Sequence, residues 1–167
     1  TIGISTAQKF TALFAYVLNG TIKNLTVSGS ATNTEAWTAG IVSYAYNSHI
    51  YKCTNRASIS GSMNLSGVVG WSNSSTIVEK CTNDAAIGSS MNNWIRAGVV
   101  CTSSNSSIIE CTNTSNGIVK GTEALAGITC SANSTVIDKC VNNGLITGNT
   151  EPNSWHTHGF AGIVAYC

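Results

Sequence analysis

Cysteine recurs in four similar phrases of this chain, "YKCTN", "EKCTN", "IECTN" and "DKCVN". The four phrases contain Cys53, Cys81, Cys111 and Cys140, and a second repeated context contains Cys101 and Cys130, which leaves Cys167 over. None of these cysteines forms a Cys-x-x-Cys pair, which argues against a structural zinc site. Two kinds of chemistry remain open: disulfide pairing in an oxidising compartment, or reduced thiols that pack as small apolar side chains.

The acidic residues and histidines do not form an evident catalytic group. Acid–base cleavage of a polysaccharide needs clustered carboxylates, whereas Glu79, Glu110 and Asp138 lie singly before the repeated cysteines, interleaved with lysines. That pattern is typical of a solvated corner of mixed charge. His156 and His158 in "WHTH" provide two imidazoles but no third ligand nearby in the sequence. We therefore predict that the protein is not an enzyme and has no catalytic residues, no metal and no cofactor.

Charged residues make up only 9% of the 167 residues, and the formal net charge is +1. Such a chain lacks the basic surface that attracts nucleic acids or anionic membranes, so we expect neither partner. No apolar run approaches the roughly 18 residues of a membrane-spanning helix, so we expect no membrane insertion. The length fits a single domain over residues 1–167.

A frame of about 28–31 residues repeats along the chain and must position the residues above. Copies begin near residues 12, 40, 67, 98, 127 and 162, and residues 1–11 form an incomplete first coil. Each copy contains three short runs rich in Val, Ile and Tyr, which are typical of strands. Stacked copies bury an apolar face that one copy cannot bury alone. The predicted fold class is all-β: a parallel β-helix (β-solenoid) of about five coils, which the usual handedness of parallel crossovers favours as right-handed.

Stacking places equivalent repeat positions in vertical columns. An aliphatic column, predicted to point inward, contains Leu13, Ile41, Val68, Val99, Ile128 and Ile163. A column of small residues, also predicted inward, contains Ala15, Ser43, Gly70, Cys101, Cys130 and Ala165. The asparagine column contains Asn55, Asn83, Asn113 and Asn142. We expect these asparagines at a corner, because Asn tolerates left-handed backbone geometry, and their stacked amides can bond to one another.

The same stacking predicts how the cysteines pair. Neighbouring coils place equivalent Cα atoms about 4.8 Å apart, within the range of roughly 4.4–6.8 Å that a disulfide spans. The simplest pairing joins Cys53 to Cys81, Cys111 to Cys140 and Cys101 to Cys130. Cys167 has no partner in a column of its own, so it is either unpaired or linked to another chain.

An aromatic column is predicted to face outward. Its large members are Tyr16, Tyr44, Trp71 and Tyr166, and strand alternation places Phe14, Val42, Val69, Val100 and Val164 on the same side. Such an apolar strip is typical of a contact surface for a neighbouring rod or for sugar rings. The alternatives are that this assignment of inward and outward positions is wrong, or that the loops carrying Trp37, Trp94 and Trp155 cover the strip.

Seven Asn-x-Ser/Thr sequons are candidate glycosylation sites in a secreted protein. They begin at Asn19, Asn24, Asn64, Asn73, Asn105, Asn113 and Asn133.

The frame Gly-[Ile/Val]-Val…Ile-x-x-Cys-x-Asn…[Ile/Val]-x-Gly, with "TALFAYVLNGTIKNLTVSG", resembles the GLUG-type repeats of bacterial cell-surface and secreted proteins. The resemblance covers roughly residues 12–167, and the chain departs from it where Cys or Thr replaces a second glycine. It implies an extracellular parallel β-solenoid of the kind found in adhesins and surface arrays, and it brings no catalytic residues.

These observations predict a non-catalytic extracellular structural protein. Its coils would stack end to end into a filament or cell-surface array, with the protein itself as the main partner. The alternative is a glycan- or protein-binding module of a cell-surface adhesin. A more distant alternative is a polysaccharide-active β-helix enzyme.

Overall fold

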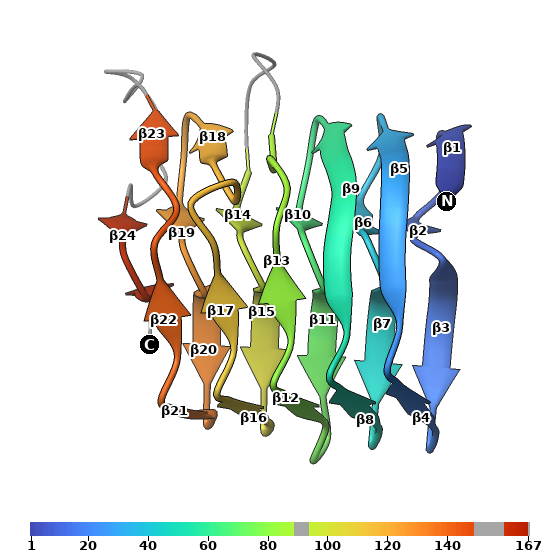
Figure 1. The fold of residues 1–167 in the computed structure, drawn as a ribbon, viewed down its shortest axis with the longest axis vertical. Coiled ribbons are helices and arrows are strands. Elements are labelled where there is room, and N and C mark those ends of the chain that lie inside the picture. Colours follow the sequence, from blue (N-terminus) through green and yellow to red (C-terminus); the bar gives the residue numbers. More distant parts are fainter. Residues whose placement is uncertain (89–93, 149–158, 167) are drawn as a thin grey trace.

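The computed structural model describes residues 1–88, 94–148 and 159–166. None of these residues is helical, and so none belongs to a helix that could cross a membrane. Figure 1 shows the strands side by side in chain order, from β1 (Ile2–Thr6) at one end to β22 (Val141–Asn142) and β24 (Phe160–Ala161) at the other. The predicted all-β parallel solenoid is confirmed.

Four parallel sheets form the sides of the solenoid. Sheet A contains β1, β5 (Thr26–Asn33), β9 (Thr54–Gly61), β13 (Thr82–Asn83), β17 (Thr112–Asn113) and β22, and it is extended by β18 (Val119–Gly121) and β23 (Ile146–Gly148). Sheet B contains β2 (Phe10–Thr11), β6 (Trp37–Ala39), β10 (Leu65–Ser66), β14 (Arg96–Ala97), β19 (Leu125–Ala126) and β24. Sheet C contains β3 (Phe14–Leu18), β7 (Val42–Tyr46), β11 (Val69–Asn73), β15 (Val100–Ser104), β20 (Thr129–Asn133) and β25 (Val164–Tyr166). Sheet D contains β4 (Thr21–Lys23), β8 (His49–Tyr51), β12 (Ile77–Glu79), β16 (Ser107–Ile109) and β21 (Val136–Asp138).

The prediction of three strands per coil is wrong, because each complete coil contributes a strand to all four sheets. The strand that the repeat pattern missed belongs to sheet B. It is only two or three residues long, as in Leu65–Ser66 and Arg96–Ala97. So short a strand shows no alternation of polar and apolar residues, which is the signal that reveals strands in a sequence.

Successive coils pair in register, so residues at the same repeat position are vertical neighbours. Asn83 pairs with Asn55 on one side and with Asn113 on the other. In sheet D, Val78 lies between Ile50 and Ile108 in the same way. This register brings together residues that are about one repeat apart in the sequence.

Two corners recur in every complete coil, and each is turned by a residue other than glycine with a positive φ. The first corner contains Asn19, Asn47, Ser74, Asn105 and Ser134, and the second contains Asn24, Lys52, Lys80, Glu110 and Lys139, with φ between 44° and 56°. Left-handed geometry is uncommon for such residues. The predicted left-handed asparagine column is therefore corrected, because Asn55, Asn83, Asn113 and Asn142 lie in strands of sheet A instead.

Aliphatic side chains fill the interior. The predicted inward column is fully buried at Ile41, Val68, Val99 and Ile128, whereas Leu13 in the first coil is 38% exposed. In the small-residue column Ser43, Gly70, Cys101 and Cys130 are buried and Ala15 is exposed.

The outward placement of the valines is wrong. Val42, Val69 and Val100 are fully buried in the main core, next to the equally buried Ile41, Val68 and Val99. Each valine begins its strand directly after the bend at the repeated glycine, where two successive side chains both enter the interior. Strand alternation applies only beyond that bend, so the predicted strip loses its aliphatic part.

Candidate functional site

A ladder of buried side-chain amides runs through the asparagine column. Asn55 Nδ2 donates to Asn83 Oδ1 at 2.9 Å, Asn83 Nδ2 to Asn113 Oδ1 at 2.8 Å, and Asn113 Nδ2 to Asn142 Oδ1 at 2.8 Å. Each Nδ2 also donates within its own coil, for example from Asn83 to the carbonyl of Ala85 at 2.9 Å. Asn55, Asn83 and Asn113 are fully buried. The satisfied amides therefore fix the vertical register rather than offer a binding group.

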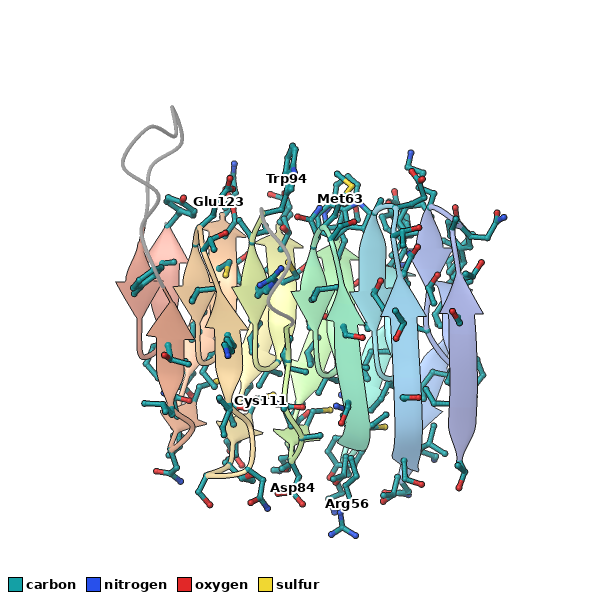
Figure 2. The ribbon with its side chains drawn as sticks, turned by 90° about the horizontal axis from the view of Figure 1, so that it is seen from above. Arg56, Met63, Asp84, Trp94, Cys111 and Glu123 are labelled. Atoms are coloured by element: carbon teal, nitrogen blue, oxygen red, sulfur yellow. The ribbon has the colours of Figure 1, made fainter. Side chains whose placement is uncertain are left out.

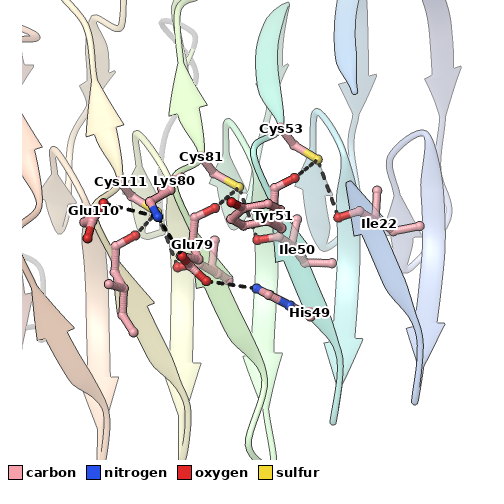
Figure 3. A network of polar contacts seen from close by, with 12 residues as sticks. Ile22, His49, Ile50, Tyr51, Cys53, Glu79, Lys80, Cys81, Glu110 and Cys111 are labelled. Carbon is pink, nitrogen blue, oxygen red and sulfur yellow. Dashed lines mark hydrogen bonds and ion pairs between the residues drawn. The ribbon is translucent and has the colours of Figure 1, made fainter. Parts of the chain in front are cut away.

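The cysteine column lies beside this ladder and faces the core; it contains Cys53, Cys81, Cys111 and Cys140. Cys81 Sγ donates to the carbonyl of Ile50 in the preceding coil at 3.3 Å and to the carbonyl of Glu79 at 3.3 Å, and Cys53 is arranged in the same way (Figure 3). The neighbouring Cys81 thiol, and then burial, raise the pKa of Cys53. The column therefore brings the predicted partners next to each other, as stacking requires.

All six described cysteines are free thiols in the structure, so the predicted disulfides stay a prediction. Equivalent side chains of parallel strands in register point the same way, about 4.8 Å apart, whereas a disulfide brings its two Cβ atoms to roughly 3.5–4.5 Å. Closing a bridge therefore requires a small local shift of one coil towards the next.

Cys101 and Cys130 form a second, shorter column between sheets B and C. Cys101 Sγ donates to the carbonyl of Ile95 at 3.3 Å, and Cys130 Sγ donates to the carbonyls of Arg96 at 2.8 Å and Ala124 at 3.2 Å. Burial raises the pKa of Cys101 well above its ordinary value and that of Cys130 to about 12. Both thiols are therefore held in the neutral form at physiological pH.

The acids before the repeated cysteines lie at the second corner, as expected for mixed surface charge. Lys80 Nζ lies 3.2 Å from Glu79 and 3.7 Å from Glu110, and His49 Nε2 lies 3.2 Å from the other oxygen of Glu79 (Figure 3). Lys80 first, and then His49, hold the pKa of Glu79 below its usual value. Within the described residues, no three His, Cys, Asp or Glu side chains are grouped as a metal ion would require.

The aromatic column is an interlocking array rather than a flat strip. Tyr16 and Tyr44 meet edge to face at 5.9 Å between ring centroids, and Tyr44 meets Trp71 at 5.2 Å. Trp37 from sheet B stacks on Trp71 at 5.4 Å with an interplanar angle of 26°. Trp37, which precedes the bend, thus covers part of the strip. This agrees with the alternative prediction that the loop carrying Trp37 covers it. Tyr16 is 56% exposed, whereas Tyr44, Trp71 and Tyr166 are half-buried.

A groove of about 350 Å³ continues from this array along the corner between sheets B and C. Its polar and aromatic lining comes from Trp37, Asn64, Trp94, Glu123, Ser131 and Tyr166. Figure 2 shows Trp94 and Glu123 at the same edge of the solenoid, opposite the edge that carries Arg56 and Asp84. Of the lining residues, Trp37, Trp94 and Tyr166 were predicted from the sequence as surface aromatics, whereas Glu123 was not predicted as a binding residue.

A fully buried arginine lies behind the groove and was also missed. Arg96 Nη1 donates to the carbonyl of Lys120 at 2.7 Å, and Arg96 Nη2 lies 3.5 Å from the carbonyl of Gly61. Burial lowers the pKa of Arg96, while the nearby Cys101 and Glu123 favour its charged form. Arg96 follows Ile95 of the groove lining and interacts electrostatically with Glu123, so it places a buried positive charge close to the groove.

The sequons divide into exposed and buried sites. Asn19, Asn24, Asn105 and Asn133 are exposed, and Asn73 is half-buried. Asn113 is fully buried in the amide ladder and Asn64 is only 7% exposed. The candidate sites at Asn113 and Asn64 are therefore corrected, because the folded chain leaves no room there for a glycan.

Four residues singled out in the sequence, namely Trp155, His156, His158 and Cys167, lie outside the described residues. The resemblance to GLUG-type repeats rests on the repeated frame alone. Comparisons of the chain with protein-family models, with curated proteins and with solved structures find no match.

Proposed function

We propose that the protein is a non-catalytic, extracellular structural protein whose coils stack end to end into a filament or surface array. The observation that carries this proposal is that each coil pairs with the next in the same register, as Val78 does with Ile50 and Ile108. A coil of the same geometry from another copy can continue such a stack. In the outermost described coils, Leu13 is 38% exposed and Phe160 is 43% exposed, and a further coil would cover both side chains.

The backbone at both ends supports the same proposal. Strands β1, β2, β3 and β4 form one outer edge, and β21, β22, β24 and β25 form the other, with a strand partner on one side only among the described residues. Open edges of parallel strands are templates for the addition of another strand. Because every coil has the same register, the edge of one copy matches the opposite edge of the next.

Mutation of one end of the solenoid tests this proposal. We expect the parent protein to form oligomers or fibres that grow with concentration in light scattering and negative-stain microscopy. Leu13→Lys places a charge on the end face and should prevent this growth, because a buried unpaired charge is costly. Ile77→Lys is the matched control, since Ile77 is 37% exposed on a middle coil, and it should assemble like the parent. Monodisperse particles of the parent at all concentrations, or equal effects of both variants, would contradict the proposal.

Disulfides between coils are part of the extracellular assignment. The oxidised protein would link Cys53 to Cys81, Cys111 to Cys140 and Cys101 to Cys130, each across one coil boundary. Each bridge closes a loop of about one coil, which the loop-entropy relation converts to roughly 3 kcal/mol. Intact mass of the secreted protein, alkylated with and without prior reduction, measures the pairing directly. Full alkylation without reduction would contradict it.

A further inference from the structure

We propose that the groove between sheets B and C binds a neutral, extended oligosaccharide. This proposal is independent of end-to-end assembly, because Trp94 and Glu123 at its centre belong to middle coils. The evidence is a groove-lining carboxylate without a partner among the described residues, beside aromatic rings that lie at several levels of the solenoid.

Glu123 is the residue that points to a ligand. Only 9% of its surface is exposed, and it lines the groove. Within residues 1–88, 94–148 and 159–166, its carboxylate makes no hydrogen bond or ion pair, and its oxygens remain accessible from the groove. Asn64 also lines the groove, and its Oδ1 lies below the groove surface without a hydrogen-bond partner among the described residues. Hydroxyl groups of a bound ligand would donate to the Glu123 carboxylate.

The aromatic rings indicate a ligand with several flat apolar faces. Trp37, Trp94 and Tyr166 line the groove, and Trp94 is 44% exposed. Aromatic rings offer large apolar faces with little loss of side-chain freedom. The C–H faces of pyranose rings stack on such surfaces, while the sugar hydroxyls remain at the ring edge for polar groups such as Glu123, Asn64 and Ser131.

The spacing of these rings decides between an extended ligand and a small cation in an aromatic cage. Four inter-strand steps separate β6, which carries Trp37, from β24, which precedes Tyr166. At about 4.8 Å per step this is roughly 19 Å along the axis. A cage for an ammonium group needs rings within about 6 Å of one cation, whereas an oligosaccharide presents successive rings along its length.

Charge decides that the ligand is neutral. The buried guanidinium of Arg96 and the Glu123 carboxylate lie close enough to interact electrostatically, so their opposite charges offset each other. The groove therefore has no excess charge that would attract either a polyanion or a cation. Hydroxyl donors satisfy Glu123 without adding charge to the groove.

Calorimetric titration with cellohexaose and chitohexaose, which are straight β-1,4-linked chains, tests the proposal, with the curved maltohexaose as a comparison. We expect saturable binding of at least one straight chain and weaker binding of maltohexaose. Trp94→Ala and the isosteric Glu123→Gln should each weaken binding roughly tenfold, from the loss of one stacking face or of charge-assisted hydrogen bonds. Trp94→Phe should restore most of the affinity lost in Trp94→Ala.

The control variant is Tyr46→Ala, because Tyr46 is an exposed aromatic residue, 40% exposed, that does not line the groove. It should bind like the parent. Thermal unfolding of every variant shows that the fold is kept, and Glu123→Gln changes no volume. Absence of binding to both straight chains at millimolar concentration overturns the proposal. Unchanged affinity of Trp94→Ala and Glu123→Gln, or an equal loss in Tyr46→Ala, overturns it as well.

Discussion

Gly67 lies directly against the side-chain amide of Asn83, so closely that a Cβ atom on Gly67 would overlap Asn83 Oδ1 and the carbonyl oxygen of Gly98. The two most regular positions of the repeat, its glycine and its asparagine, therefore form one packing unit inside four of the coils. The others of these contain the same unit as Gly40 with Asn55, Gly98 with Asn113, and Gly127 with Asn142.

Gly67→Ala should lower the free energy of unfolding by about 3 kcal/mol, because the added methyl group overpacks a site with no flexible neighbour. Guanidinium unfolding followed by circular dichroism measures the change. Gly3→Ala is the matched control, since no atom lies within 4 Å of a Cβ built there, and it should have little effect. Equal stability of the two variants would show that the amide gives way easily.

Asn83→Ala should cost about 3 kcal/mol, because it leaves the amide of Asn55 and the carbonyl of Ala85 buried without a partner. Asn142→Ala removes the last amide of the ladder, where the side chain is half-buried and water can replace the lost contact. Its cost in the same unfolding experiment should be clearly smaller. Equal costs would contradict a ladder whose inner members support one another.

A double-mutant cycle tests whether the glycine and the asparagine act together. Asn83→Ala removes two of the three atoms nearest to the methyl group of Gly67→Ala and leaves the Gly98 carbonyl oxygen, so part of the cost should disappear. The double variant should therefore be more stable than the sum of the single effects by about 1 kcal/mol. Strict additivity of the two changes in unfolding free energy would show that the glycine and the asparagine contribute to stability independently.

Alkaline pH should destabilise the reduced protein through Cys130. Its pKa in the folded state is about 12 against an ordinary value of 9.0. Between pH 9 and 12 the folded protein keeps the Cys130 proton, whereas the unfolded chain loses it. The free energy of unfolding therefore falls as pH rises through this range, by up to about 4 kcal/mol for the full shift. Below pH 9 the effect is absent. Urea unfolding under reducing conditions at pH 8 and pH 10.5 measures it, and Cys130→Ala should show a flatter pH dependence. An identical slope in the variant would contradict the assignment.

The columns were predictable because each consists of similar side chains at one position of the repeat. Ile41 and its equivalents are aliphatic in every copy. Asn55 and its equivalents carry an amide in the four copies that begin at residues 40, 67, 98 and 127, whereas the copy that begins at residue 12 has Val27 there. Burial and the amide ladder therefore follow from register alone. The corners were harder to predict. Lys52 and Glu110 adopt left-handed geometry because the strands on either side hold them there, and nothing in a lysine or a glutamate favours it.

The groove was only partly predictable, because it depends on contacts between coils whose members differ from copy to copy. Trp94 and Glu123 occupy the same repeat position, four residues before the glycines Gly98 and Gly127, while Trp37 and Asn64 lie three residues before Gly40 and Gly67. A comparison of these two repeat positions from copy to copy would have shown a column of polar and aromatic residues next to the bend. Which of its members share one hollow depends on the short strands of sheet B, which leave no pattern in the sequence.

Both left-handed corners recur in every complete coil, which has a consequence for how such a molecule changes its length. A duplicated gene segment of one repeat would bring its own two bends, its own amide and its own glycine, and the flanking coils would meet the same surface as before. The rod would grow by roughly 4.8 Å without any adjustment elsewhere. The length of the rod can therefore vary between related molecules through the number of repeats alone, while the solvent-facing side chains vary independently of that number.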